Sequence, residues 1–232
     1  MATITDRNTA VVTGASRGIG RAVALRFGAT HHVVAIARSR PELETLASEI
    51  RSGGGSCDAV EIDVTDATAV ARTLAGVRAD VLVNNAGVGY MKPLLELSSD
   101  EWHTMVDVNF NALFHVTRAV LPGMVERGRG HIVMVGSIAG RSAFVGGSCY
   151  AATKHAVMGF SESLMLEVRD QGVKVSVVNP GSVATTFSRR DRDTSWMITA
   201  DDVADAVIHA IDTPPRVLVH RIEVRAAVPK RG

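Results

Sequence analysis

Short apolar runs alternate along this chain with longer segments in which apolar residues recur at helical spacing. Alternation of this kind predicts successive strand–helix units that join into a parallel sheet. We therefore expect an α/β protein with a doubly wound parallel sheet of about seven strands and helices on both faces. The expected strands cover Thr9–Thr13, His32–Ala37, 59–62, a fourth beginning at 81–83, 131–135, 173–178 and 222–228, and the expected helices cover 19–27, 41–51, Ala67–Leu74, 98–125, 150–169 and 201–211.

Two prolines mark the expected helices in different ways. Pro41 stands in a first helical turn, where its missing N–H costs nothing, and residues 98–100 supply a helix N-cap. Pro122 lies inside the expected helix at 98–125. Because proline removes a helical hydrogen bond, we expect Pro122 to kink or end that helix.

The composition indicates one folded domain with an aliphatic core. The chain has 232 residues, 46% hydrophobic but only 4% aromatic, with 21 glycines and no Pro/Gly/Ser-rich linker, so we expect a single domain over 1–232. The charged fraction of 21% and the net charge of +1 exclude a disordered chain. They also argue against nucleic acid or an anionic membrane as an obligatory partner, since both need a concentrated basic surface.

The cysteines and the N-terminus point to a reducing compartment. Cys57 and Cys149 form no disulfide framework and stand in no metal-ligand spacing. No signal-peptide core precedes the first strand, and no uncharged stretch has membrane-spanning length. We expect a soluble, cytoplasmic protein.

A glycine-rich turn joins the first expected strand to the first expected helix. Residues 13–20 read TGASRGIG, with the spacing G-x3-G-x-G rather than the G-x-G-x-x-G of the general dinucleotide fingerprint. At this place, backbone N–H groups and the positive helix end can face a pyrophosphate. An ordinary turn with chance glycines is the alternative, but the strand–turn–helix context favours phosphate binding.

The end of the second expected strand bears on the choice of dinucleotide. NAD-selective sites usually have an acidic residue there, which binds the ribose hydroxyls. Here Arg38 and Arg40 follow the strand instead, and Arg17 lies inside the glycine turn. Guanidinium groups make charge-assisted contacts with phosphate. We expect Arg17 and Arg38 to bind the 2′-phosphate of NADP(H), and Arg40 to be a solvated surface residue.

A tyrosine and a lysine stand one helical turn apart at the start of a later helix. Tyr150 and Lys154 share a helix face, and an ammonium group favours the phenolate form of a nearby tyrosine. Ser137 follows the fifth expected strand, at the carboxyl edge where open α/β sheets bind ligands. Its hydroxyl could hold a substrate oxygen. A surface contact on an amphipathic helix is the alternative for the Tyr–Lys pair taken alone.

Together these motifs resemble the short-chain dehydrogenase/reductase family over nearly the whole chain. Residues 13–20 match its cofactor motif, Asp63 and Val64 its adenine-contacting position, and the NNAG at residues 84–87 the end of its fourth strand. Asn109, Ser137, Tyr150 and Lys154 match its catalytic tetrad, and residues 179–185 match its nicotinamide-side loop. The resemblance implies a single-domain Rossmann fold.

The resemblance also implies a role for each matching residue. Ser137 would orient the substrate oxygen, Tyr150 would exchange its proton, and Lys154 would lower the tyrosine pKa and hold the nicotinamide ribose. The main chain of Asn109 would position a water next to Lys154. The implied cofactor-binding residues are Gly14, Ser16, Arg17, Gly18, Ile19, Gly20, Arg38, Asp63, Val64, Asn85, Ala86, Gly87, Tyr150, Lys154, Pro180, Gly181, Val183 and Thr185.

The expected activity is NADP(H)-dependent interconversion of a carbonyl and an alcohol on a small-molecule substrate. One alternative is 3-oxoacyl-carrier-protein reduction, for which Arg127 and Arg129 are a thin hint of a basic docking face. Another is a non-catalytic NADP(H)-binding sensor, which the intact tetrad disfavours. The long helices at 98–125 and 150–169 resemble those that pair subunits in this family, so we expect a homodimer or homotetramer. The C-terminal residues depart from the family's glycine-rich tail, which puts the second tetramer interface in doubt.

Several residues have a plainer interpretation. Cys149 adjoins Tyr150, but a small buried filler is the better reading. The pair His31–His32 has no third ligand nearby in the sequence. Tyr90 and Met91 could touch substrate or pack in a loop. The mixed-charge run at residues 189–193 falls in the family's substrate-loop region, where it could form part of a short lid over an open pocket.

Overall fold

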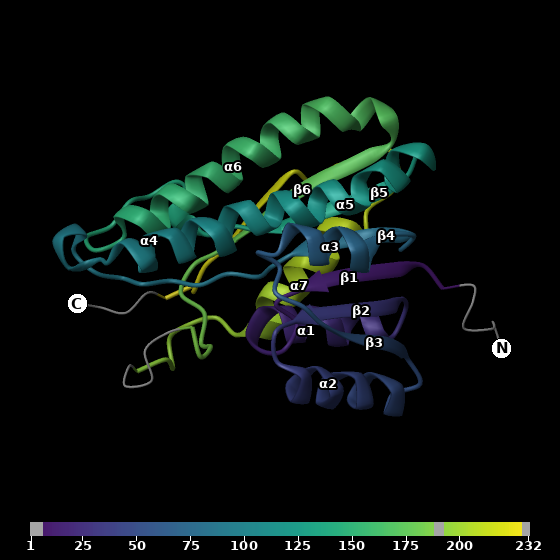
Figure 1. The fold of residues 1–232 in the computed structure, drawn as a ribbon, viewed down its shortest axis with the longest axis horizontal. Helices are drawn as coiled ribbons and strands as arrows, with labels where there is room; N and C mark the ends of the chain where they lie inside the picture. Colours follow the sequence, from purple (N-terminus) through teal and green to yellow (C-terminus); the bar gives the residue numbers. More distant parts are fainter. Residues whose placement is uncertain (1–6, 188–192, 229–232) are drawn as a thin grey trace.

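The computed structural model describes residues 7–187 and 193–228. Seven parallel strands form one sheet in the order β3-β2-β1-β4-β5-β6-β7 (Figure 1). This is the doubly wound arrangement of a Rossmann fold, in which the strand order reverses between β1 and β4. The strands are β1 (Thr9–Thr13), β2 (His32–Ala37), β3 (Ser56–Glu61), β4 (Ala79–Asn84), β5 (Gly130–Val135), β6 (Val173–Pro180) and β7 (Arg221–Val224).

Helices cover both faces of the sheet, as the alternating pattern predicts. One core packs α1, α2 and α7 against the sheet, and the other packs α3, α5 and α6 against the opposite face. The helices are α1 (Gly18–Gly28), α2 (Arg40–Ser52), α3 (Ala67–Leu74), α4 (Ser99–Val106), α5 (Ala112–Glu126), α6 (Ser148–Val168) and α7 (Ala200–Ile211).

Both edge strands differ from their predicted bounds. β3 begins at Ser56, three residues before the predicted start, because as an edge strand it exposes Asp58 and its apolar run is short. β7 ends at Val224, four residues before the predicted end. Its pairing stops there because Pro180, the partner of Val224, is the last residue of β6.

The predicted helix at 98–125 is three segments rather than one. Ser98 caps α4 through a capping box with Glu101, which confirms the predicted N-cap. A π segment, Asp107–Asn111, then joins α4 to α5. Pro122 does not end the helix, since α5 continues to Glu126. Pro122 and Arg118, whose carbonyl loses its helical donor, both lie on an exposed face where water can replace the lost hydrogen bond.

Within the parts of the chain that the structure describes, no helix is both long enough and apolar enough to cross a lipid bilayer.

Candidate active site

The glycine-rich turn lies at the carboxyl end of β1, where the strand order reverses. Gly14 and Gly18 have φ of +65° and +56°, a region that side chains disfavour. A Cβ on Gly20 would lie 2.3 Å from the Gly14 carbonyl oxygen. Glycine therefore lets this turn close on itself and leaves the first N–H groups of α1 uncovered. A cradle of this shape fits a pyrophosphate.

Thr13 ties that turn to the neighbouring one. Thr13 is 2% exposed, and its hydroxyl accepts hydrogen bonds from the backbone N–H groups of Asn85 (3.0 Å) and Ala86 (3.1 Å). The Asn85 side chain returns a hydrogen bond to the Thr13 carbonyl at 2.9 Å. The turns after β1 and β4 thus form one rigid unit at the reversal of strand order, which is where open α/β sheets bind dinucleotides.

The predicted arginines lie beside the end of β2 and at the start of α1. Arg38 follows β2, and its Nη1 is 3.9 Å from Oδ2 of Asp63, a loose pair with the Arg38 side chain 69% exposed. Arg17 is exposed at the start of α1, and no side-chain cap occupies that helix end. Arg40 instead pairs with Glu44 at 2.5 Å one turn along α2. The geometry agrees with the prediction that Arg40 is an ordinary surface residue.

Ser137 and Tyr150 meet at the carboxyl edge next to β5. Ser137 is 8% exposed, and the Asn179 side chain fixes its backbone by accepting from Ser137 N at 3.1 Å. Tyr150 is partly buried in the first turns of α6. Burial raises the pKa of the Tyr150 phenol, and a hydrogen bond with Ser137 opposes part of that rise. Tyr150 therefore holds its proton at neutral pH in this structure.

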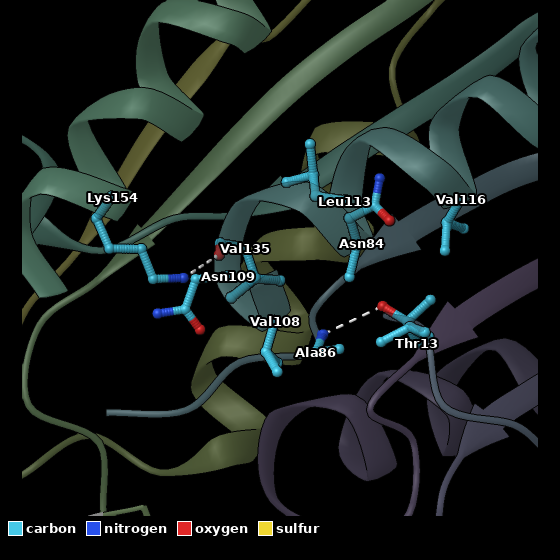
Figure 2. A pocket seen from close by; sticks show the side chains of 11 residues that line it. Thr13, Asn84, Ala86, Val108, Asn109, Leu113, Val116, Val135 and Lys154 are labelled. Carbon is cyan, nitrogen blue, oxygen red and sulfur yellow. Dashed lines mark hydrogen bonds between the residues drawn. The ribbon is translucent and has the colours of Figure 1, made fainter. Parts of the chain in front are cut away.

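Lys154 lies one turn further along α6 and is 6% exposed. Its Nζ donates to the Val135 carbonyl at 3.0 Å (Figure 2). The same atom lies 5.8 Å from the centre of the Tyr150 ring. Burial lowers the pKa of the Lys154 ammonium to about 8. No carboxylate contributes to that pKa. Because the pKa lies close to physiological pH, a change in the surroundings of the amine would change its protonation.

Asn109 comes from the π segment and bridges two elements. Its side chain accepts from Val88 N (2.8 Å) and donates to Val88 O (3.0 Å) and Thr153 Oγ1 (3.2 Å). Thr153 in turn donates to the Tyr150 carbonyl at 2.8 Å. Asn109 thereby fixes the loop after β4 against the helix that carries Tyr150 and Lys154. π segments often occur at functional sites, and this one sets the direction of a site residue.

A small cavity of about 10 Å³ lies between these elements. Figure 2 shows Thr13, Asn84, Asn109 and Lys154 around it, on β1, β4, the π segment and α6. The Asn84 Oδ1 atom is buried and has no hydrogen-bond partner in the structure. The same cavity is therefore reached by polar groups beside the glycine-rich turn (Thr13 and Asn84) and by polar groups beside Tyr150 (Asn109 and Lys154).

The loop after β6 completes the site. A Cβ on Gly18 would lie 3.6 Å from Cγ2 of Thr185, so this loop reaches the glycine turn. Val183 forms a parallel bridge with Ile198 and is 9% exposed, which anchors the loop. Residues 189–192 of the predicted substrate loop lie outside the described residues.

Apart from Asn109, which comes from the π segment, the predicted site residues lie at or after the carboxyl ends of strands or in the first turns of α1 and α6, along one edge of the sheet. The sequence analysis missed the supports beneath them, namely Thr153 and Asn179, and it gave no role to Thr13. Asn179 is the first residue of the family motif at residues 179–185. That motif was the one signal in the sequence that pointed to Asn179.

Cys149, which the sequence analysis interprets as a small buried filler, is buried in the structure. Cys149 is 2% exposed with its sulfur 3.8 Å from the Trp102 carbonyl oxygen, and burial raises the pKa of its thiol. His32 pairs across strands with Ser56 (2.7 Å) and Asp58 (3.2 Å), so its environment is a sheet edge.

The model of the family described as short chain dehydrogenase matches residues 8–196. The chain belongs to the short-chain dehydrogenase/reductase family. One curated relative of this short-chain dehydrogenase is the NADP-dependent 3-hydroxy acid dehydrogenase YdfG of Escherichia coli (strain K12), 35% identical over 233 residues that cover 92% of this chain and 93% of the relative.

Solved structures of the family superpose closely on this dehydrogenase. A metagenomic short-chain oxidoreductase in complex with NADP has a TM-score of 0.84 at 35% identity, with 95% of this chain and 98% of the other covered. The closed form of a serine dehydrogenase complexed with NADP+ has a TM-score of 0.87 at 32% identity, with 96% of each chain covered.

Proposed function

We propose that this protein is an NADP(H)-dependent oxidoreductase that interconverts a carbonyl and an alcohol on a small molecule, with Tyr150 as the acid/base group. The observation that carries the proposal is the meeting of Ser137 and Tyr150 beside a buried Lys154, at the sheet edge that also holds the glycine turn. Family membership supports oxidoreductase chemistry, and the structures named above hold NADP.

The cofactor supplies the hydride that is exchanged with the substrate carbon. Gly14, Gly18 and Gly20 would leave the turn free of side chains for its pyrophosphate, with Ser16 and Ile19 in the same turn. Arg17 and Arg38 are two exposed cations at the adenosine end, and a second phosphate there would be charge-compensated. Asp63, Val64 and residues 85–87 would hold the adenine side of the cofactor, while Pro180, Gly181, Val183 and Thr185 would hold its nicotinamide side.

Ser137 is placed to hydrogen-bond the substrate oxygen, and Tyr150 to give or take its proton. A phenol whose pKa is raised by burial keeps its proton at neutral pH, which is the form that carbonyl reduction needs, and it supplies little of the phenolate that alcohol oxidation needs. Lys154 adjusts this balance, because its ammonium form stabilises the phenolate through space. The family resemblance gives the main chain of Asn109 the further role of positioning a water next to Lys154.

The test is reduction of a ketone panel with NADPH, followed by the loss of cofactor absorbance. Wild type should oxidise NADPH with at least one ketone, whereas Tyr150→Phe should lose at least about 100-fold in kcat, the usual range for a proton-transfer group. Both should bind NADPH with equal affinity by fluorescence. If the two proteins are equally inert across a broad panel while NADPH still binds, the enzyme proposal is wrong and the sensor alternative stands.

The carrier-protein alternative gains no support from the two arginines that suggested it. Arg127 donates to the Ala79 carbonyl at 2.6 Å, and Arg129 pairs with Asp80 at 3.3 Å. Ala79 and Asp80 begin β4, so both arginines lie at the amino edge of the sheet, opposite the candidate site. A carrier docked there could not present its acyl group to Tyr150.

We further propose that residues 1–232 form a single domain that assembles as a homodimer or homotetramer. Phe114 on α5 and Leu166 on α6 are 42% and 55% exposed, which gives these helices the apolar surface that subunit pairing needs. Light scattering of the purified protein measures the mass directly, and a monomer would contradict the assembly.

A further inference from the structure

The serine of the candidate site lies just beyond the end of strand β5. Gly136 N still pairs with the Val178 carbonyl of β6 at 2.8 Å, although β5 itself ends at Val135. At Ser137 a side chain takes over this pairing, since Ser137 N donates to Oδ1 of Asn179 at 3.1 Å. Asn179 is 1% exposed, so bulk water does not compete for this hydrogen bond. The contact between the serine and β6 therefore depends on one buried amide.

Gly136 leaves the space that this amide occupies. A Cβ on Gly136 would lie 2.2 Å from Asn179 Oδ1, well inside the contact distance of two non-bonded atoms. Gly136 has no positive φ, so glycine is needed here for space and not for backbone conformation. The residue before Ser137 and the amide that holds Ser137 thus fit each other in shape.

Two further hydrogen bonds of Ser137 are local. Its Oγ accepts from Ala139 N at 3.1 Å, and its carbonyl accepts from Gly140 N at 2.9 Å, within the 3-10 turn Ile138–Gly140 that Ser137 caps. Both of these bonds would move with the turn, because both donors belong to it. Of the three bonds, the one with Asn179 is the one that reaches Ser137 from another strand.

The bond with Ala139 also directs the hydroxyl of Ser137. An N–H donor on the hydroxyl oxygen leaves the hydroxyl proton available for donation, and Ser137 hydrogen-bonds the phenol of Tyr150. On its other side the turn packs on α6, since a Cβ on Gly140 would lie 2.8 Å from the Lys154 carbonyl oxygen. A shift of Ser137 relative to β6 therefore changes its position relative to Tyr150.

We infer, on the basis of the proposed function, that Asn179 is a positioning residue for the reaction: its hydrogen bond to Ser137 N holds the serine hydroxyl where it meets the same substrate oxygen as Tyr150. A donor to that oxygen contributes most in the transition state, when negative charge develops there. Misplacing Ser137 should therefore lower kcat and leave cofactor binding unchanged. The alternative is that the amide only stabilises the fold, as buried hydrogen-bonded amides commonly do.

Asn179→Leu tests the inference in the full-length protein, with NADPH and the ketone of the panel that wild type reduces fastest. Leucine is close to asparagine in shape but offers no acceptor to Ser137 N. We expect kcat to fall at least about tenfold, because a displacement of about 1 Å at a reacting group can cost up to about 100-fold. The Kd of NADPH, measured by fluorescence, should stay within about twofold of wild type. Asn179→Met, which also lacks the acceptor but adapts its shape, replaces the leucine variant if that variant does not fold.

A conservative variant and a control on the same strand accompany this measurement. Asn179→Asp keeps an oxygen acceptor for Ser137 N, so its kcat should stay within about threefold of wild type. In the control, Ser176→Ala, the lost hydroxyl donates to the Val219 carbonyl at 2.6 Å and lies 2.8 Å from His131 Nε2. Its removal also leaves buried polar groups unpaired on β6. The control should lower Tm but leave kcat unchanged.

The same substitution in a Ser137→Ala background separates positioning from stabilisation of the fold. Ser137→Ala alone should lower kcat about 100-fold, the usual cost of losing one donor to a developing charge. If Asn179 acts through the serine hydroxyl, adding Asn179→Leu should then change kcat by less than about twofold, because the two substitutions remove the same interaction. If the amide only stabilises the fold, Asn179→Leu should change kcat by the same factor in both backgrounds.

The outcomes separate this inference from the proposed function. The inference is overturned if Asn179→Leu works as fast as wild type, if Asn179→Asp is as slow as Asn179→Leu, or if the full loss persists in the Ser137→Ala background. A rise in the Kd of NADPH as large as the loss in kcat also overturns it, since the effect would then pass through the cofactor. Each of these results leaves the proposed function standing. If wild type reduces no ketone faster than Tyr150→Phe does, the proposed function itself fails and the inference fails with it.

Discussion

Replacing Thr13 by valine keeps the shape of the side chain but removes the hydroxyl that joins the turns after β1 and β4. The backbone N–H groups of Asn85 and Ala86, which now donate to it at 3.0 and 3.1 Å, would lose their acceptor. Each buried donor left unpaired costs about 1–3 kcal/mol. Asn85 and Ala86 are only half-buried, so water recovers part of this, and we expect a loss of about 3 kcal/mol in the free energy of unfolding.

For a domain of this size, 3 kcal/mol corresponds to a fall in Tm of about 6 to 12 °C, measurable by circular dichroism. Thr13→Ser is the control, because it keeps the hydroxyl and loses one buried methyl group, at about 1 kcal/mol. The affinity for NADPH, followed by fluorescence, should fall in Thr13→Val and much less in Thr13→Ser. A valine variant as stable as the serine variant would refute the assignment of Thr13 as the tie between the two turns.

Three further substitutions test other parts of the structure. Gly20→Ala places a Cβ 2.3 Å from the Gly14 carbonyl oxygen, so a titration should show NADPH binding weakened at least about tenfold even if the variant folds. Arg38→Asp should remove much of the advantage of NADPH over NADH in kcat/KM; an unchanged preference would show that Arg38 does not bind the 2′-phosphate. Burial lowers the pKa of His131 to about 4, so stability is full above about pH 6.5 and should fall by about 3 kcal/mol as the pH drops to 4. Guanidinium unfolding at several pH values should show a flatter profile for His131→Gln, and parallel profiles would contradict the assignment.

How far the sequence predicts this fold depends on how each segment is buried. Central strands are apolar on both faces, so β1 and β2 lie where their continuous apolar runs place them. The edge strands β3 and β7 alternate between exposed and covered residues, and their ends depend on which partner residues are available for pairing. The π segment inside the predicted helix at 98–125 was missed for a different reason: its extra residue displaces the apolar spacing by one position, and helical spacing already alternates between three and four residues.

How much of the candidate site the sequence predicts depends on whether the signal is local. Short motifs with fixed spacing identified residues such as Tyr150, Lys154 and the turn glycines. Their supports are long-range: Asn109 bonds Thr153 44 positions away, and Asn179 fixes Ser137 from 42 positions away. No local pattern in a single sequence predicts contacts between residues so far apart. Among the apolar side chains near Tyr150, the sequence analysis weighed Met91 as a substrate contact. It did not identify Phe187, which belongs to no motif.

The π segment also makes the chain sensitive to its own length at this point. Each residue advances an α-helix by about 100°, so a helix with one residue in excess turns everything beyond it by that angle. Deleting a single residue from Asp107–Asn111 would restore a regular helix and rotate Leu113 and Val116 of α5 away from the sheet, or else carry Asn109 away from Val88. A substitution in this segment alters one contact. After a one-residue deletion, the packing of α5 in the core and the hydrogen bonds of Asn109 in the site cannot both be kept.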